Sequence, residues 1–199
     1  MVATLEYEQK FWNQGKTVIG FDEAGRGPIA GDMYYALVQL HQNVQLPFDL
    51  KDSKKYSDRK RFELEKQVAP YIAKKKLGSV RVNQINTGAN LNDLMYASIV
   101  HAIFSWAPEF ILLVDGNQYI RHIPREAQFV KPKLDELSVS CAIASILAKN
   151  AQVRAMIELD KSYPGYGFVL HKGYGTEKHY DAIKKFGLCE AHREKWIKK

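Results

Sequence analysis

The chain has 199 residues, and 46% of them are hydrophobic, which excludes a disordered chain and is sufficient for a packed core. The formal net charge of +7 favours phosphate-rich partners such as nucleic acid without requiring them. No apolar run reaches membrane-spanning length, and residues 1–16 lack the apolar segment of a secretory signal. We therefore expect a cytoplasmic protein with no membrane partner.

Apolar runs predict strands in the first half of the chain. Residues 17–21 form a short apolar run, and a glycine-rich turn separates them from residues 33–40, which are rich in Tyr, Val and Leu. Two consecutive strands joined by a tight turn predict a hairpin. Ser57 is placed to cap a helix that runs until Pro70, and residues 77–82 predict another strand.

The second half of the chain alternates helices with a strand. Residues 91–106 carry apolar side chains at helical spacing, and the apolar run 110–114 is typical of a central strand buried on both faces. Residues 139–159 predict a long, alanine-rich helix. A loop rich in glycine and tyrosine follows at residues 163–175, and two short helices end the chain. This order predicts an α/β fold with a central mixed β-sheet flanked by helices.

Acidic residues stand where two predicted strands end. Asp22 and Glu23 follow the first apolar run, and Asp115 ends the central one. If these strands are neighbours, Asp22 and Asp115 can meet, and carboxylates held together either take up protons or bind a cation. Hard oxygen ligands suit Mg²⁺ or Mn²⁺, and two such ions can support phosphodiester hydrolysis. The alternative is that these acids only shape turns, where aspartate is common.

The adjacency of Asp22 and Glu23 sets a geometric condition on such a site. Adjacent residues of a regular strand face opposite sides of the sheet. The two carboxylates therefore share a site only if the strand ends or twists there, or if a metal bridges them at the edge of the sheet.

Other segments suit nucleic acid, and each also has a plain structural alternative. The GRG segment (Gly25-Arg26-Gly27) lets a sugar-phosphate backbone approach closely, or it simply makes a turn. Residues 52–55 offer cations and a hydroxyl to phosphates, or they form a solvated charge run. Residues 163–168 and 171–176 mix aromatics, glycines and cations that suit stacking beside phosphates, or they pack as loop aromatics.

Cysteines and histidines predict no metal site from their spacing. Cys141 and Cys189 form no CxxC pair, and Cys141 lies in an apolar run that favours a buried, inert thiol. His171, His179 and His192 are too scattered to indicate a metal site.

Taken together and in this order, these segments resemble ribonuclease HII. The resemblance runs from about residue 18 to residue 196, and the ordered set is highly specific although each segment alone is weak. The segments are VIGFDEAGRGPIAG (18–31), LKDSKK (50–55), LLVDGNQ (112–118), ASILAK (144–149), YPGYGFVLHKGYGT (163–176) and HREKW (192–196).

The resemblance implies a ribonuclease H-like fold in one catalytic domain, residues 1–199, with a C-terminal helical extension from about residue 160. It implies an endonuclease that hydrolyses the RNA strand of RNA–DNA hybrids. It also implies cleavage 5′ of single ribonucleotides embedded in duplex DNA, and therefore a role in removing ribonucleotides from DNA. In this family four carboxylates bind two divalent ions, Mg²⁺ or Mn²⁺. By motif match, Asp22, Glu23 and Asp115 are the first three catalytic and metal-binding residues.

The fourth carboxylate is expected from the segment before the ASILAK helix. The family has K-G-D or K-A-D there, and this chain has Lys133-Leu134-Asp135-Glu136. The resemblance assigns Asp135 as the catalytic and metal-binding residue, with Glu136 as its competitor. Leu134 stands where the family has glycine or alanine.

Further residues are assigned to the substrate by motif match. Gly25, Arg26 and Gly27 match the family's sensor of the ribose 2′-hydroxyl at an RNA–DNA junction. Tyr174 matches the tyrosine that stacks on the following deoxyribose. Together the GRG segment and the tyrosine can recognise a 2′-hydroxyl on the sugar at one side of the junction and its absence on the sugar at the other side. The expected phosphate contacts are Lys54, Lys55 and Lys172.

Two further features bear on the resemblance. The family commonly continues the ASILAK segment with V-x-R-D, whereas this chain has Asn150-Ala151-Gln152-Val153, so an Arg–Asp pair is lost. We interpret these positions as supporting rather than ligating. Residues 195–199 show no sliding-clamp motif, and we expect a monomer without that partner. The related ribonuclease HIII type usually has an extra N-terminal domain and lacks this GRG form, so it fits less well.

Two other functions stay open from the sequence. The changed segment at residues 150–153 suits a non-catalytic binder of RNA–DNA junctions. A ribonuclease H-like nuclease with another DNA substrate, such as a resolvase-type enzyme, shares the acidic residues but has no use for the GRG and HKGY segments.

Overall fold

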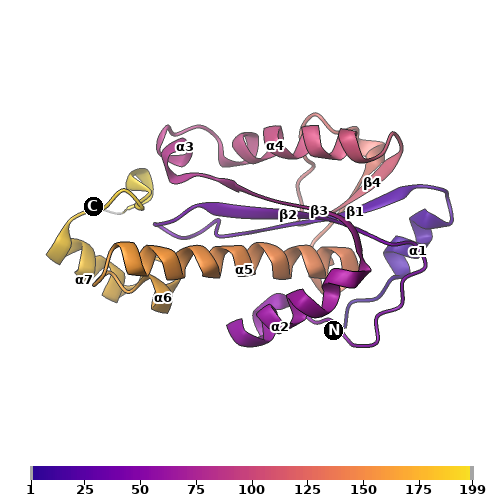
Figure 1. The fold of residues 1–199 in the computed structure, drawn as a ribbon. Coiled ribbons are helices and arrows are strands. Elements are labelled where there is room, and N and C mark those ends of the chain that lie inside the picture. Colours follow the sequence, from indigo (N-terminus) through magenta and orange to yellow (C-terminus); the bar gives the residue numbers. More distant parts are fainter. Residues whose placement is uncertain (1, 198–199) are drawn as a thin grey trace.

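A five-stranded mixed sheet forms the centre of the computed structural model, which describes residues 2–197 (Figure 1). The strand order is β3-β2-β1-β4-β5, so β1 lies in the middle. β1 pairs antiparallel with β2 and parallel with β4, while β3 and β5 extend the sheet antiparallel and parallel, respectively. The strands are β1 (Thr17–Ala24), β2 (Met33–Leu40), β3 (Ile72–Val80), β4 (Phe110–Asp115) and β5 (Gln128–Lys131).

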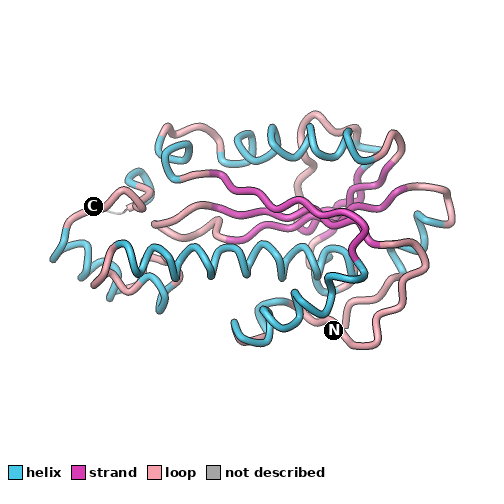
Figure 2. The backbone as a smooth tube through the Cα atoms, viewed as in Figure 1, coloured by secondary structure: helices cyan, strands magenta, loops and turns pink. Residues whose placement is uncertain are grey.

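Helices cover both faces of this sheet, as Figure 2 shows by colour. α3 and α4 lie on one face and α2 and α5 on the other, and α6 and α7 gather at the C-terminal end of α5 (Figure 1). This layered arrangement confirms the predicted α/β fold with a mixed sheet. The helices are α1 (Glu6–Trp12), α2 (Asp58–Val68), α3 (Val82–Asn86), α4 (Leu91–Trp106), α5 (Val139–Ser162), α6 (Phe168–His171) and α7 (Glu177–Phe186).

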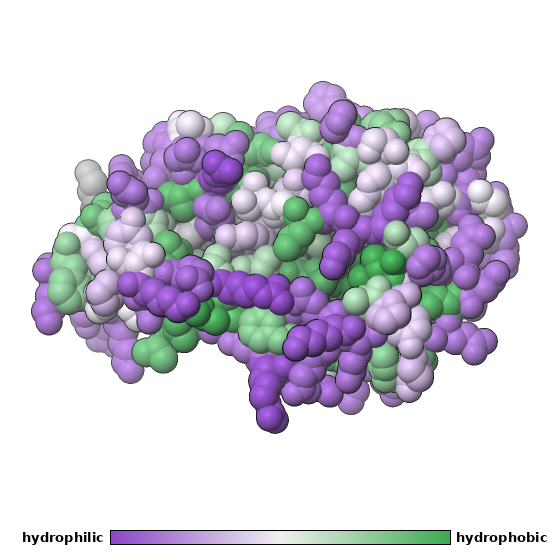
Figure 3. Space-filling view, in the orientation of Figure 1, coloured by the Kyte–Doolittle hydropathy of each residue, from purple (hydrophilic) through white to green (hydrophobic). Residues whose placement is uncertain are grey.

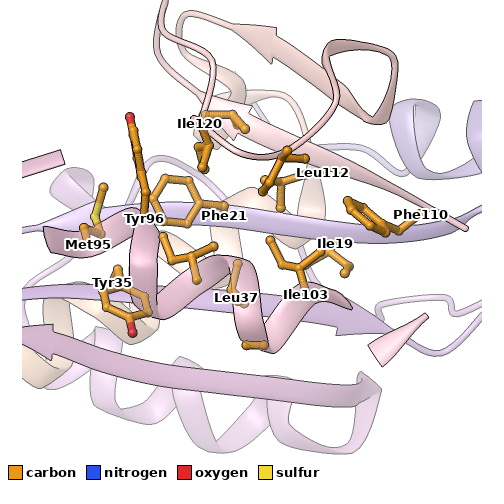
Figure 4. Close-up of a cluster of buried hydrophobic side chains, with 14 of the residues drawn as sticks. Ile19, Phe21, Tyr35, Leu37, Met95, Tyr96, Ile103, Phe110, Leu112 and Ile120 are labelled. Carbon is orange, nitrogen blue, oxygen red and sulfur yellow. The ribbon is translucent and has the colours of Figure 1, made fainter. Parts of the chain in front are cut away.

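The core beneath α4 is built from alternate residues of the strands. Ile19 and Phe21 of β1 are buried against α4, whereas the residues between them face the opposite side. Figure 4 shows these side chains meeting those of α4. The other labelled members of this cluster are Tyr35, Leu37, Met95, Tyr96, Ile103, Phe110, Leu112 and Ile120.

On the opposite face, α5 approaches β1 very closely because small residues meet there. A Cβ added to Gly20 would lie 2.4 Å from the backbone carbon of Ser140 and 2.6 Å from the backbone nitrogen of Cys141. The first half of α5 is buried and includes Ala142, Ala144 and Ala148. This close contact brings α5 against the strand that carries Asp22.

Most predicted elements are confirmed by the structure. β1 and β2 pair antiparallel as expected, although residues 25–32 form a longer connection than a tight turn. Ser57 caps α2 by accepting a hydrogen bond from the Lys60 amide at 3.2 Å. α4 has the predicted bounds, and α5 continues past the predicted end at residue 159 to Ser162.

The prediction for the third strand was wrong at both ends. β3 begins at Ile72 rather than residue 77, and it ends at Val80 because Val82 already begins α3. β3 lies at the edge of the sheet, where three lysines at positions 74–76 interrupt the apolar pattern. Lys74 and Lys75 are exposed and discourage pairing with another chain. α1 and β5 were not predicted at all.

The surface carries no extended apolar band on the face shown in Figure 3. Hydrophilic side chains are spread over most of this view, and the hydrophobic areas between them are separate. Among residues 2–197, no helix is both long enough and apolar enough to cross a membrane.

The contact at Gly20 predicts a strong effect of a single methyl group. We expect Gly20→Ala to lower the free energy of unfolding by about 3 kcal/mol, because the new Cβ overlaps the backbone of α5. Chemical denaturation of both proteins measures this difference. Gly15→Ala is the control, since its φ is +73° but nothing lies within 4 Å of the added Cβ. Its expected loss is about 1 kcal/mol, and an equal loss in both variants would contradict the packing argument.

Candidate active site

Three aspartates from three separate segments meet at one end of the central strands. Asp22 lies in β1, Asp115 ends the neighbouring parallel strand β4, and Asp135 lies in a short 3₁₀ turn, Leu134–Glu136. One oxygen of each carboxylate lies within 4.8 Å of the others. We call these three residues the carboxylate cluster. The register of β1 and β4, which pairs Phe21 with Val114, brings the first two together as the sequence hypothesis required.

Strand β5 delivers the third aspartate. β5 runs parallel to β4 and pairs Lys131 with Asp115, and the chain then turns at Lys133, which has a φ of +63°. The Leu134 amide donates a hydrogen bond of 2.7 Å to Asp115 Oδ1. The Leu134 side chain is fully buried in an apolar cluster, so the larger residue is accommodated by the core. Asp135 then follows directly into the carboxylate cluster.

Glu136 lies differently from its neighbour. Its side chain is only 17% exposed, and its carboxylate lies near Lys55, with 3.8 Å between Oε2 and Nζ. It is not among the three acids that the structure brings together. The geometry thus favours Asp135 over Glu136 as a metal ligand.

Burial and mutual repulsion disfavour the ionised forms of these acids. Burial raises the pKa of Asp22 well above its usual range, and the nearby carboxylates of Glu23 and Asp115 raise it further. Burial also raises the pKa of Asp135 to about 6, with Asp115 adding to the effect and Lys54 opposing it. For Lys54, burial lowers the pKa, but the surrounding carboxylates, Asp135 foremost, outweigh burial and raise it. An added divalent cation would relieve this repulsion, and oxygen-only donors suit Mg²⁺ or Mn²⁺.

Glu23 lies next to the carboxylate cluster but not in it. β1 continues to Ala24, so the strand does not end between Asp22 and Glu23, and their side chains leave it on opposite faces. Glu23 Oε1 accepts a hydrogen bond of 3.1 Å from Arg26 Nε. Its carboxylate nevertheless lines the same hollow as Asp22 and Asp115.

The GRG segment is held from behind by a buried arginine that the sequence analysis did not single out. Arg193 has no exposed surface, and its guanidinium donates to the backbone carbonyls of Gly25 (2.8 Å), Arg26 (3.1 Å) and Gly31 (2.7 Å). Burial lowers the pKa of Arg193 to about 10, so it stays charged at neutral pH. Gly25 has a φ of +85°, which only glycine adopts without strain. The signal available in the sequence was only that Arg193 belongs to the HREKW segment.

Tyr174 lies beside the GRG segment. A Cβ added to Gly27 would lie 3.4 Å from the Tyr174 ring, and Tyr174 is 42% exposed. The ammonium group of Lys149 lies 5.9 Å from the ring centroid. The GRG segment, Tyr174, Lys149 and three acids line one hollow of ≈ 230 Å³. These acids are Asp22, Glu23 and Asp115, whereas Asp135 lies next to the hollow through its contact with Asp22 and Asp115. Lys149 is thus a site residue to which the sequence alone assigned no role.

The other predicted cations lie around this hollow. Lys54 lines it, and the Asp52 side chain accepts a hydrogen bond of 2.8 Å from the Lys54 amide. Lys172 is paired with Asp58 at 2.9 Å and does not line the hollow. Lys55 is directed to Glu136, as described above.

Residues 150–153, where this chain departs from the family pattern, are packed inside the protein. Gln152 is fully buried, and its Oε1 accepts a hydrogen bond of 2.8 Å from Lys149 Nζ. Asn150 is also buried and donates to the Arg61 carbonyl at 3.0 Å. These contacts agree with a supporting role, because Gln152 orients a lysine that lines the hollow.

The raised pKa of Asp135 predicts how the metal-free protein responds to pH. Between the ordinary pKa of 3.8 and about 6, the native state holds more protons than the unfolded state, so the free energy of unfolding falls as pH rises through this window. In EDTA, we expect the thermal midpoint to decline across it. Asp135→Asn should flatten the decline and raise the midpoint at neutral pH. Glu136→Gln, whose acid faces Lys55, should keep the wild-type slope. If the thermal midpoint of Asp135→Asn fell with pH as steeply as that of wild type, the assignment of this pH dependence to Asp135 would be wrong.

Comparisons with known proteins identify the family of this chain. The sequence matches the family model for ribonuclease HII over residues 19–199. The ribonuclease HII of Endomicrobium trichonymphae is 35% identical over 194 residues, which cover 95% of this chain and 90% of that protein. The ribonuclease HII of Geotalea uraniireducens is 39% identical over 195 residues, covering 96% and 88%.

Solved structures show the same fold. The chain resembles the structure of the PCNA:RNase HII complex from Archaeoglobus fulgidus, with a TM-score of 0.74, 22% identity, and coverage of 92% of this chain and 96% of that one. It also resembles Bst-RNase HIII in complex with Mn²⁺, with a TM-score of 0.67, 22% identity, and coverage of 91% and 64%. The structure therefore has the ribonuclease H-like fold that the resemblance implied. The family match and the near full-length relatives show that this chain belongs to the ribonuclease HII family, whose members are ribonuclease H endonucleases.

Proposed function

We propose that this endonuclease hydrolyses the RNA strand of RNA–DNA hybrids and nicks 5′ of a single ribonucleotide embedded in duplex DNA, using two divalent ions. The observation that carries the proposal is the single hollow in which acids, the GRG segment and Tyr174 lie side by side. Acids alone fit many nucleases. Their position next to a tight glycine segment and an exposed aromatic ring favours a substrate whose sugars differ on the two sides of the cut.

The carboxylate cluster would hold one divalent ion, Mg²⁺ or Mn²⁺, and Glu23, from the neighbouring face of β1, would contribute to a second. Bound ions would supply Lewis-acid stabilisation of the phosphate and would lower the pKa of the attacking water. The donor set fits, because it consists of carboxylate oxygens within 4.8 Å of one another whose charges repel when no cation is present. A ribonuclease HIII of the same fold is described in complex with Mn²⁺, which supports this class of ion.

The GRG segment and Tyr174 would read the sugars at the junction. Glycine at positions 25 and 27 leaves room for a ribose to approach the backbone, and Arg26 is held by Glu23 and by Asn92 Oδ1 at 2.8 Å. Tyr174 offers its exposed ring to the next sugar, where a 2′-hydroxyl is absent. Stacking of this kind tolerates any base, so we expect little dependence on sequence.

Cations around the hollow would bind the phosphates. Lys54 is held near the carboxylate cluster, where it would meet the phosphate next to the cut. Lys55 and Lys172 lie farther out in ion pairs with Glu136 and Asp58, and a substrate phosphate would compete for them. Such contacts position the duplex without reading its sequence.

The central test is a nicking assay with a DNA duplex that contains one ribonucleotide. We expect cleavage 5′ of the ribonucleotide in Mg²⁺ or Mn²⁺ and none in EDTA. Asp22→Asn, Asp115→Asn and Asp135→Asn should each lower the rate by about 100-fold or more, because each removes a ligand of the metal site. Glu136→Gln is the matched control for Asp135→Asn and should stay within about threefold of wild type, because Glu136 pairs with Lys55 and is not one of the three clustered acids.

Different outcomes of this assay discriminate the rival functions. A fully active Asp22→Asn protein would rule out the proposed mechanism. Tight binding of the duplex without cleavage in either metal would favour the non-catalytic junction binder. Cleavage of an all-DNA junction, with no preference for the ribonucleotide, would favour a resolvase-type nuclease.

The partners and the location expected from the sequence stay predictions. The PCNA in the Archaeoglobus fulgidus structure is a partner of that ribonuclease HII. The segment examined for a clamp motif includes Lys198 and Lys199, which lie outside the described residues. The monomeric state, the cytoplasmic location and the single domain over residues 1–199 are likewise untested proposals.

A further inference from the structure

Three histidines that the proposed mechanism does not use gather beneath the loop that carries Tyr174. His171 ends α6, His179 lies in α7, and His192 forms a bridge with Ala30. The rings of His171 and His179 are stacked with centroids 4.1 Å apart, and His179 Nε2 lies 3.2 Å from His192 Nε2. His179 and His192 are almost completely buried.

The hydrogen-bond partners of His179 assign its tautomer, and the contact between the two rings then assigns that of His192. His179 Nδ1 lies 2.9 Å from the carbonyl oxygen of Tyr174, which can only accept, so Nδ1 carries the proton. Neutral His179 then accepts at Nε2, and His192 must donate from its own Nε2. His192 Nδ1 then accepts from the Cys189 amide at 2.9 Å, which is shorter than its 3.1 Å separation from the Cys189 carbonyl oxygen. One ordered chain of donors thus runs from Cys189 through both rings to Tyr174.

His171 holds the same loop from the other side of the stack. Its Nε2 donates to the Tyr166 carbonyl at 2.9 Å, so its Nδ1 accepts, and the Gly173 amide donates to it at 3.2 Å. The Gly173 carbonyl in turn accepts from the amides of Ile29 (2.8 Å) and Ala30 (3.2 Å), which follow the GRG segment. The stacked pair therefore ties the backbone of residues 173–174 to the stretch that carries the GRG segment.

We propose that His179, supported by His192 and His171, is a positioning residue that sets the place of Tyr174 against the GRG segment and so sets specificity for the RNA–DNA junction. This inference rests on the proposed function of Tyr174. Its basis is the asymmetry of Tyr174: its carbonyl accepts from a buried imidazole, whereas the residue as a whole is 42% exposed and lines the hollow. Burial lowers the pKa of His179 to about 4, which keeps the ring neutral and the donor chain intact at neutral pH.

Two substitutions at position 179 separate hydrogen bonding from packing. His179→Phe keeps a ring against His171 and Phe168 but removes the donor to Tyr174. His179→Asn loses the ring but can place its amide nitrogen near the position of Nδ1. We expect His179→Phe to lower kcat/KM on the single-ribonucleotide duplex by about tenfold, and His179→Asn by less than about threefold, because a displacement of the reading residue is costly even at a distance from the cut.

A double-mutant cycle shows whether the effect passes through Tyr174. In a Tyr174→Ala background, which keeps the backbone carbonyl, His179→Phe should lower kcat/KM by less than about twofold further. An undiminished tenfold loss in that background would overturn the inference, and so would a His179→Phe enzyme at least as active as His179→Asn. Thermal midpoints of all variants, measured in parallel, show whether each is folded.

Amide hydrogen exchange tests the same inference without cleavage. The Gly173 and Tyr174 amides should exchange faster in His179→Phe than in wild type and His179→Asn, because the loop loses its anchor. Equal protection in all three proteins would overturn the positioning role. If wild type fails to nick the duplex while this exchange pattern appears, the proposed substrate is wrong and the anchoring of the loop stands.

Discussion

Repulsion among buried carboxylates is the constraint on which the rest of the site depends. Asp22 and Asp135 are buried beside Asp115, although burial and proximity raise the pKa of both. A fold keeps such a cluster only when rigid elements prevent the acids from moving apart. Here the register between β1 and β4 fixes two of them, and the Leu134 amide, bonded to Asp115, fixes the turn that carries the third. The site is therefore built for an added positive charge before any substrate arrives.

The close contact between α5 and β1 supplies the second layer of this rigidity. Gly20 lies on the same face of β1 as Asp22, so the helix that packs against the glycine also passes the acid. Ser145 of α5 lines the hollow, and its hydroxyl lies 2.9 Å from the Ser53 hydroxyl. This serine pair fastens the 3₁₀ turn Ser53–Lys55 to α5 and with it holds Lys54 near the acids. The close contact at Gly20 thus places Asp22 and Lys54 near each other.

The sequence predicts those parts of the molecule that depend on local pattern. The apolar runs of β1 and β4 and the helical spacing of α4 and α5 are local, and each was found. β5 has only four residues and was not predicted. The start of β3 was not predicted because its lysines interrupt the apolar pattern of this edge strand. The choice between Asp135 and Glu136 depends on a turn with a left-handed residue at Lys133, which no periodicity indicates.

Contacts between distant segments lie beyond such patterns, and they decide how the GRG segment and Tyr174, which we propose to read the substrate, are held. Arg193 reaches back across more than 160 residues to the carbonyls of Gly25 and Arg26. Its neighbour His192 reaches Tyr174 through His179. A buried guanidinium is costly unless its donors find acceptors, and here three of its N–H groups donate to backbone carbonyls of residues 25–31.

The two consecutive residues 192 and 193 thus fix the two sides of the hollow relative to each other. The Arg193 amide also donates to the Ile29 carbonyl at 2.8 Å, and the Gly31 amide donates to the Ala191 carbonyl at 2.8 Å, so the backbone itself is locked between these anchors. A sensor that compares adjacent sugars needs a constant distance between its two contacts, because a loose pair would accept either sugar on either side. In this chain that distance is set by the C-terminal segment, far in sequence from the acids that would do the chemistry.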